Sequence, residues 1–282
     1  MKILIIGGTS SVGKALNVVL SEFSKIITAG RNGCDIYLDL SDSIENMSIP
    51  ENIDVLIHTA AHFGGKKPHE IIEAENINAL GTLKICEIAV NAKVKHFIFI
   101  SSIFSSLTEK SMHYNIYTIS KKHGEELAQF YCSQNSMPLT ILKPSQVYGN
   151  EEYFGRHQPF FYNIVNRAQN NEDINLYGSH DAMRNFIHIE DLANIIVRVV
   201  QRKIYGNYIC TQKEDVSYSE IAGAALKAFN SNKKVNFLKD KPDITDNIFE
   251  KDFTLYDKID FSPRISIIEG MKKIANYRVS NS

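Results

Sequence analysis

Short apolar runs alternate with helix-period patterns along the first half of the chain. The runs are rich in β-branched residues and lie at 2–6, 25–29, 35–40, 54–61, 96–102 and 139–144. Such runs are typical of strands buried on both faces of a parallel sheet. Apolar residues at helical spacing fill the segments between them, at 12–23, 71–91 and 115–134. Strands that alternate with helices predict an α/β fold, here a Rossmann-type doubly wound parallel sheet.

The pattern loosens beyond residue 150. The segment 150–182 mixes aromatic, charged and amide residues, and apolar positions at helical spacing return only between 192 and 200. A short strand is expected at 206–211 and a helix at 266–277. We expect a main domain over 1–149, with 183–205 returning to it. A smaller C-terminal substrate-binding lid is then expected from 150–182 and 206–282.

Composition excludes several classes of protein. The 282 residues carry a net charge of -1, which gives no electrostatic footprint for nucleic acid or an anionic membrane. The four cysteines lie far apart without a C-x-x-C pair, so neither a disulfide framework nor a metal site is expected. The apolar run ILII near the N-terminus is too short for a signal peptide or a membrane span. A reduced cytoplasmic protein is the expectation.

A glycine-rich turn joins the first strand to the first helix, in IIGGTSSVGKAL. Backbone N–H groups and the positive end of a helix dipole meet there, which suits a pyrophosphate. Ser10 stands where a middle glycine is usual, and many strand–helix turns contain glycine for backbone reasons alone. The flanking strand and helix favour dinucleotide binding by the residues of this turn, which are Gly7, Thr9, Ser10, Ser11, Val12 and Gly13.

The second strand ends in TAGRN, so Arg31 occupies the place where an NAD-specific site offers an acid to the ribose. A guanidinium pairs bidentately with a 2′-phosphate. Arg31 therefore favours NADP over NAD as the cofactor, with a solvated surface arginine as the alternative.

Several segments occur together in one order: GGTSSVG (7–13), LDL (38–40), DVLIHTAA (54–61), NALGT (78–82), FIFISS (97–102), YTISK (117–121), LKPSQVYG (142–149) and RNFIHIEDLA (184–193). In this order the chain resembles an extended short-chain dehydrogenase/reductase of the nucleotide-sugar epimerase/dehydratase/reductase family. Each segment is weak alone, but together they span most of the chain.

The resemblance implies roles for the matching residues. Tyr117 would be the catalytic acid/base, Lys121 would hold the nicotinamide ribose and tune Tyr117, and Ser102 would hydrogen-bond the reacting oxygen, with Ser101 as the alternative. Asn78 would support the structure behind the active site, and Arg184 would contact a nucleotide diphosphate unless it forms a surface salt bridge. The remaining expected cofactor contacts are Asp39, Leu40, Ala60, Ala61, Pro144 and Val147.

The Tyr117–Lys121 spacing also makes physical sense. About one Tyr-x-x-x-Lys is expected by chance in a chain of this composition, so the spacing alone decides little. On a helix, however, position i+4 places Lys121 one turn from Tyr117 on the same face. A fixed ammonium there would stabilise a phenolate that otherwise forms only near pH 10. His58, inside an apolar strand, is expected to be structural.

The two residues directly after Ser102 narrow the reaction. Dehydratases of this family usually carry an Asp-Glu pair there, whereas this chain has Ile103 and Phe104. Ile103 and Phe104 argue against dehydration, and the NADP preference favours a reductase that consumes reducing equivalents, so the expected function is a nucleotide-sugar 4-ketoreductase. The alternatives are an NAD-dependent 4-epimerase, a reductase of small non-sugar carbonyls, and a non-catalytic dinucleotide sensor or scaffold. The resemblance further suggests a homodimer.

Overall fold

The computed structural model describes residues 1–281, and the chain divides into two compact units. The first unit comprises Met1–Pro144, Ala193–Cys210 and Asp252–Asp260. The second comprises 145–192, 211–251 and the chain from 261 onward.

The first unit is built on a seven-stranded sheet in the order β11-β6-β5-β4-β1-β2-β3, with every pairing parallel. Its strands are β1 (Lys2–Ile6), β2 (Lys25–Gly30), β3 (Ile36–Tyr37), β4 (Val55–His58), β5 (His96–Ile100), β6 (Leu139–Pro144) and β11 (Gly206–Cys210). The order reverses between β1 and β4, where ligands of doubly wound sheets bind. The predicted Rossmann-type fold is confirmed.

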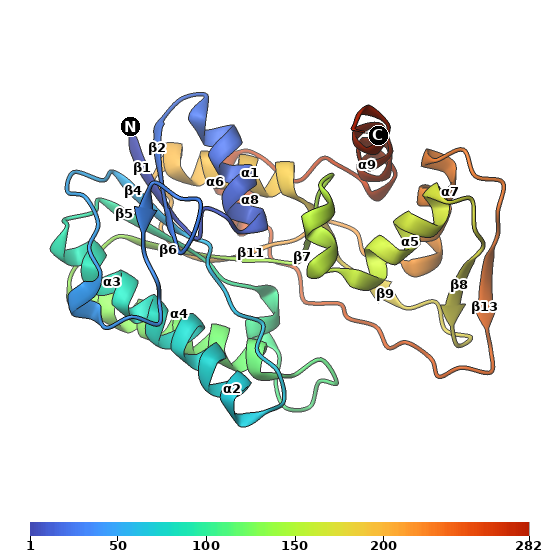
Figure 1. Ribbon diagram of the computed structural model, residues 1–282, viewed down its shortest axis with the longest axis horizontal. Coiled ribbons are helices and arrows are strands. Elements are labelled where there is room, and N and C mark those ends of the chain that lie inside the picture. The colour runs from blue at the N-terminus through green and yellow to red at the C-terminus, as the bar shows by residue number, and fades with distance from the viewer. Residues whose placement is uncertain (282) are drawn as a thin grey trace. The chain divides into compact units, whose positions relative to one another are not determined.

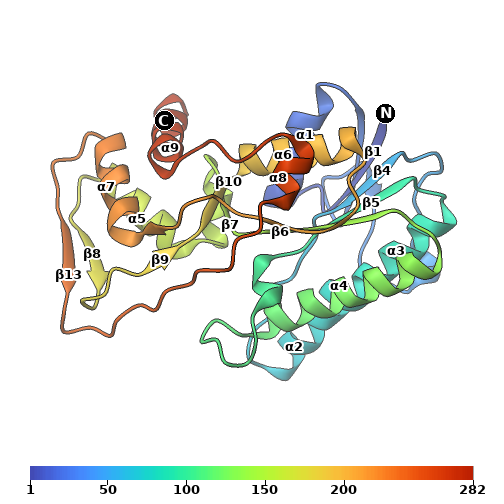
Figure 2. The same cartoon turned by 180° about the vertical axis from the view of Figure 1, so that it is seen from behind.

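Helices cover both faces of this sheet (Figure 1). On one side lie α2 (Pro68–Glu75), α3 (Gly81–Asn91) and α4 (Ile116–Gln134), and on the other α1 (Ser11–Ser21), α6 (Ile189–Arg202) and α8 (Thr254–Ile259). The same grouping appears from behind in Figure 2. Apolar residues of β1, β4, β5, α3 and α4 form the core between the sheet and the first set of helices.

The segment expected as one helix over 71–91 is divided in the structure. A π-helical stretch, η2 (Asn76–Leu80), separates α2 from α3. Such stretches often occur at functional sites. Here the stretch carries Asn78, whose side chain is buried and whose Nδ2 donates to the His62 carbonyl (2.7 Å) and to Ser120 Oγ (2.9 Å).

Several boundaries between the units differ from the expected ones: residues 145–149 belong to the second unit, and Asp252–Asp260 to the first. The strand β11 belongs to the main sheet, because it pairs in register with β6 along its whole length. The segment 183–192 belongs instead to the second unit, because β10 (Phe186–His188) pairs with β7 (Gln146–Tyr148).

Three two-stranded sheets organise the second unit. Besides β7–β10, they are β9 (Met183–Arg184) with β12 (Val216–Ser217), and β8 (Ile174–Tyr177) with β13 (Val235–Leu238). Its helices are η4 (Glu152–Arg156), α5 (Pro159–Gln169), α7 (Tyr218–Ala228) and α9 (Ile267–Ser280). No helix within residues 1–281 is long and apolar enough to cross a bilayer.

Candidate active site

The glycine-rich turn after β1 is built for close approach of backbone. Gly7 has φ +80°, and a Cβ there would lie 2.6 Å from the Ala60 nitrogen. A Cβ on Gly13 would lie 2.3 Å from the Gly7 carbonyl oxygen. The turn therefore requires glycine at both positions, because a Cβ atom at either one would collide with backbone atoms.

Ser10, which replaces the usual middle glycine, caps α1. Its Oγ accepts from the Gly13 N–H (2.9 Å) and lies 2.9 Å from Thr59 Oγ1. Helical geometry leaves the N–H groups of Ser11 and Val12, the first two residues of α1, without intrahelical acceptors. These donors and the helix dipole fit a pyrophosphate, so the turn suits a dinucleotide.

The chain after β2 and around β3 carries an exposed cation, Arg31, and two acids with hydrogen-bond partners, Asp35 and Asp39. The Asp35 carboxylate accepts from the Thr28 N–H and the Thr28 hydroxyl, each at 2.8 Å, and these bonds lower its pKa. Burial raises the pKa of Asp39, but hydrogen bonds from Ser41 and the charges of Arg31 and Lys84 together bring it below its usual value. Leu40 beside it is buried.

The loop after β4 lies against both the glycine turn, through Ala60, and α4, through Phe63. Ala60 is half-buried, Ala61 is exposed, and Thr59 Oγ1 donates to the Ile6 carbonyl (2.9 Å). Phe63 lies flat against the ring of Tyr117, with centroids 4.8 Å apart and planes 18° apart. His62 Nδ1 accepts from the Gly64 N–H, and its Nε2 lies 3.6 Å from Glu73 of α2.

Tyr117, Lys121 and Ser102 come together at the end of β5. Asn115 caps α4 by accepting from the N–H groups of Tyr117 and Thr118, so Tyr117 is fixed in the first turn. The Ser102 hydroxyl lies close to the Tyr117 side chain, where it opposes the increase that burial causes in the Tyr117 pKa. Lys121 is 1% exposed, and its Nζ donates to the Ile100 carbonyl (2.9 Å). The three predicted residues thus form one cluster in the first unit.

The structure distinguishes the two candidate serines. The Ser101 hydroxyl donates to Glu125 Oε1. Ser102 is the serine whose hydroxyl lies close to the tyrosine, while it also accepts from the Phe104 N–H (3.3 Å).

Burial controls the ionisation of this cluster. Burial raises the pKa of Tyr117 to about 12, helped by the negative charge of Glu125 and opposed by the Ser102 hydroxyl. Burial lowers the pKa of Lys121 to about 7, opposed by Glu125. His58 is wholly buried, stacks on Phe99 and contacts Thr82 Oγ1 (3.2 Å), and burial lowers its pKa to about 3. His58 is therefore a neutral core residue.

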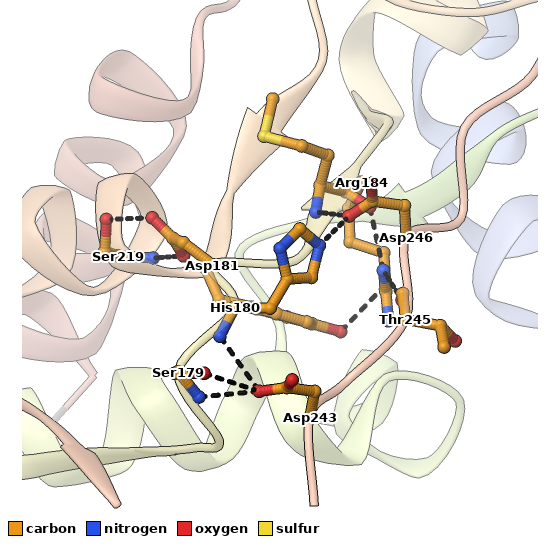
Figure 3. A network of polar contacts seen from close by, with 10 residues as sticks. Ser179, His180, Asp181, Arg184, Ser219, Asp243, Thr245 and Asp246 are labelled. Atoms are coloured by element: carbon orange, nitrogen blue, oxygen red, sulfur yellow. Dashed lines mark hydrogen bonds and ion pairs between the residues drawn. The ribbon is translucent and has the colours of Figure 1, made fainter. Parts of the chain in front are cut away.

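Pro144 ends β6 in the first unit, whereas Val147 and Arg184 belong to the second. Val147 lies in β7, which pairs with β10. Arg184 is 5% exposed, and its guanidinium donates to the carbonyls of Met183 and Thr245 and to Tyr218 Oη (Figure 3). Within residues 1–281, Arg184 forms no ion pair with a carboxylate and is buried. It therefore does not form the surface salt bridge that was the alternative expectation.

Neither Phe63 nor Glu125 has a role predicted from the sequence, although Phe63 stacks on Tyr117 and the charge of Glu125 acts on Tyr117 and Lys121. For Glu125 a signal was present, since it lies four residues after Lys121 on the same helix face. For Phe63 no sequence pattern indicates the stacking. No group of three or more potential metal ligands occurs in the described part of the chain.

A Rossmann-type sheet, a glycine-rich turn after its first strand, and a Ser/Tyr/Lys cluster at the end of β5 define an extended short-chain dehydrogenase/reductase. The model of the NAD dependent epimerase/dehydratase family matches residues 3–209, and the chain belongs to that family. Its homologues include nucleotide-sugar dehydratases, reductases and epimerases.

Two relatives and one solved structure illustrate the similarity. The dTDP-D-glucose 4,6-dehydratase of Dictyostelium discoideum is 29% identical over 251 residues, 73% of this chain but 57% of that protein. The CDP-abequose synthase of Salmonella muenchen is 24% identical over 296 residues, 98% of both chains. The Bordetella bronchiseptica enzyme WbmF, solved in complex with NAD+ and UDP, has a TM-score of 0.82 at 20% identity, covering 99% of this chain and 92% of its own. The match to WbmF shows the fold.

Proposed function

We propose that this protein is an NADP-preferring reductase of the 4-keto group of a nucleotide-activated sugar. The observation that carries the proposal is the placement of Lys121 one turn after Tyr117 on α4, with the Ser102 hydroxyl close to the Tyr117 side chain. In the protein alone, the Tyr117 pKa of about 12 keeps the phenol protonated at neutral pH. A protonated phenol is a proton donor, and ketone reduction needs one.

The chain's own residues would handle the substrate oxygen. A bound nicotinamide cofactor supplies hydride to the carbonyl carbon. Tyr117 Oη donates its proton to the carbonyl oxygen, so that the ketone becomes an alcohol, and the phenolate is later reprotonated from solvent. Ser102 Oγ–H donates a hydrogen bond to the same oxygen as negative charge builds on it. The Lys121 ammonium stabilises the phenolate that remains.

The cofactor would be held mainly by the first unit. The N–H groups of Ser11 and Val12, in the turn from Gly7 to Gly13, face the pyrophosphate, with Thr9 and Ser10 beside them. Arg31 supports the NADP preference, because it is exposed while the nearby Asp35 carboxylate is engaged by Thr28. Asp39, Leu40, Ala60, Ala61, Pro144 and Val147 complete the proposed contacts.

The residues after Ser102 support reduction over dehydration. Ile103 is fully buried and Phe104 is aromatic, so neither offers the acid or base that elimination requires. An NAD-dependent 4-epimerase would use the same Ser/Tyr/Lys cluster, and it is the second candidate because the family includes epimerases. Cofactor consumption separates the two, since an epimerase regenerates its cofactor and a reductase does not.

The second unit is the proposed substrate-binding part. Arg184 supports this assignment, because its buried guanidinium hydrogen-bonds neutral oxygens, while the Asp246 carboxylate interacts with its charge without an ion-pair contact. A buried cation without a directly paired carboxylate favours an anionic ligand such as a nucleotide diphosphate. Figure 3 shows Arg184 directed toward the 243–246 segment, within a network of short polar contacts.

We also propose that the protein is a cytoplasmic homodimer. The four cysteines are free thiols, which suits a reducing compartment. Three large apolar side chains are exposed on neighbouring helical elements: Ile72 of α2 (59%), Leu80 of η2 (47%) and Phe130 of α4 (66%). An apolar surface of this kind on paired helices fits self-association.

A panel of 4-keto-6-deoxy sugars carried on dTDP, CDP, UDP and GDP, each with NADPH or NADH, tests the proposal. The expected result is stoichiometric loss of nicotinamide absorbance with one of these sugars, faster with NADPH. Tightly bound NAD in purified protein, with no net NADPH loss and with 4-epimerisation of the corresponding 4-hydroxy nucleotide sugars, would instead establish the epimerase. A Tyr117→Phe variant that retains full turnover would remove the catalytic assignment and favour a dinucleotide sensor.

A further inference from the structure

Glu125 lies on the same face of α4 as Tyr117 and Lys121, at successive intervals of four residues. Residues four apart on a helix are neighbours, so Glu125 adjoins Lys121 on the side away from Tyr117. The residue is 6% exposed. A buried carboxylate is unfavourable unless it is paired and hydrogen-bonded, so its partners show what the structure uses it for.

Those partners fasten the Ser102 loop to α4. Glu125 Oε1 accepts from the hydroxyls of Ser101 and Ser105, and Oε2 lies 3.5 Å from Lys143 Nζ on β6. Ser101 directly precedes Ser102, and Ser105 Oγ also lies 2.7 Å from the Ser102 carbonyl oxygen. The carboxylate thus holds the chain on both sides of Ser102.

The structure assigns Glu125 as a positioning residue: its carboxylate fixes the Ser102 loop through the two serines and places a negative charge one helical turn from Lys121. Its consequence for turnover rests on the proposed reductase function, whereas its electrostatic effect on Lys121 does not.

The charged and titratable groups around Lys121 support this assignment. From α4 it faces Tyr117 and Glu125, and from β5 it faces the Ile100 carbonyl and the Phe99 ring, 4.3 Å from Nζ to the centroid. From β4 it faces His58, whose imidazole is neutral at physiological pH because its pKa is about 3. Lys143 of β6 acts on the other side of Glu125. Within residues 1–281, Glu125 is the carboxylate that raises the Lys121 pKa against burial.

The direct test measures the Lys121 pKa without substrate, by NMR titration of protein labelled with carbon-13 at lysine Cε. The Lys121→Met variant identifies the signal. We expect Glu125→Gln, which keeps the shape but removes the charge, to lower the Lys121 pKa by about one unit, a tenfold change in its protonation ratio. Glu126→Gln, an exposed neighbour on the same helix, is the matched control and should leave the titration unchanged. Equal titrations in the two variants would overturn the inference.

Lys143→Gln gives a second test, with the opposite sign. Removing this ammonium leaves the Glu125 charge less compensated, so the Lys121 pKa should rise. This variant keeps the inference testable if Glu125→Gln does not fold, and a fall in the Lys121 pKa would contradict it.

Turnover provides a separate readout. Glu125→Gln should lower kcat about tenfold above neutral pH, with a smaller loss at lower pH where Lys121 stays protonated, and Glu125→Asp should restore part of the loss. A shifted Lys121 titration without any reductase activity would retain this inference and reject the proposed function. Reductase activity with an unshifted Lys121 titration would retain the proposed function and reject this inference.

Discussion

Replacement of Lys121 by methionine should stabilise the protein near neutral pH while abolishing its activity. The Lys121 side chain is 1% exposed, and burial lowers its pKa from 10.5 to about 7 despite the opposing charge of Glu125. The folded protein therefore holds an ammonium in a place that disfavours it. Methionine is of similar length and carries no charge, so it removes this penalty.

The size of the effect follows from the pKa difference. A fall of about 3.5 pH units between the unfolded and folded states corresponds to about 5 kcal/mol, taken as an upper limit. Between pH 7 and 10.5 the unfolded state binds more protons than the folded one, so wild-type stability rises with pH across that window. The stability advantage of Lys121→Met is thus greatest below about pH 7 and declines by about 3 kcal/mol between pH 7 and 9.5.

Urea unfolding at a series of pH values between 6 and about 9.5 measures this decline, because the unfolding free energy is extrapolated at each pH. Lys122→Met is the matched control, since Lys122 is the exposed neighbour on α4 and should show no such pH dependence. If the difference between Lys121→Met and wild type stays constant over the window, Lys121 is not a buried cation in the folded protein and the reasoning fails.

Three further outcomes are expected. Arg31→Ala should weaken NADPH binding about tenfold and leave NADH binding unchanged, because only NADPH carries the 2′-phosphate; equal losses for the two cofactors in a fluorescence titration would contradict the assignment. Gly7→Ala should destabilise the protein by about 2 kcal/mol or more, because φ is +80° and the new Cβ meets the Ala60 backbone. Gly223→Ala, with open space around the Cβ, is the control and should not destabilise in the same urea assay. Phe130→Glu should convert a dimer into a monomer in light scattering, and an unchanged mass would exclude this surface as the interface.

Local sequence pattern predicted most of the first unit. Strands buried on both faces give continuous apolar runs, and β6 begins and ends where LTILKP does. The π-helical stretch at Asn76–Leu80 was not predicted, since it depends on side-chain bonds from Asn78 to the distant residues His62 and Ser120. The second unit was described only loosely, because its short strands pair residues far apart in sequence, such as β8 with β13.

In the site too, residues in a local pattern could be predicted, whereas residues placed by the fold could not. Tyr117 and Lys121 follow from a helical spacing that sequence alone displays, and the structure brings them to Ser102. Glu125 and Glu126 are adjacent acids, and only the packed structure shows that Glu125 is buried against Ser101 and Ser105. The stacking of Phe63 on Tyr117 depends on the path of the loop after β4, which has no periodicity to read.

Transfer of deuterium from NADPH labelled at nicotinamide C4 tests the central proposal most directly. With a nucleotide-linked 4-keto sugar, the product should be an alcohol carrying one deuterium at the former carbonyl carbon, with one NADPH oxidised for each alcohol formed. Tyr117→Phe should reduce the rate of this transfer by about 100-fold or more. Recovery of the 4-keto sugar with no NADPH oxidised, together with 4-epimerisation of the corresponding 4-hydroxy nucleotide sugar, would contradict the reductase account.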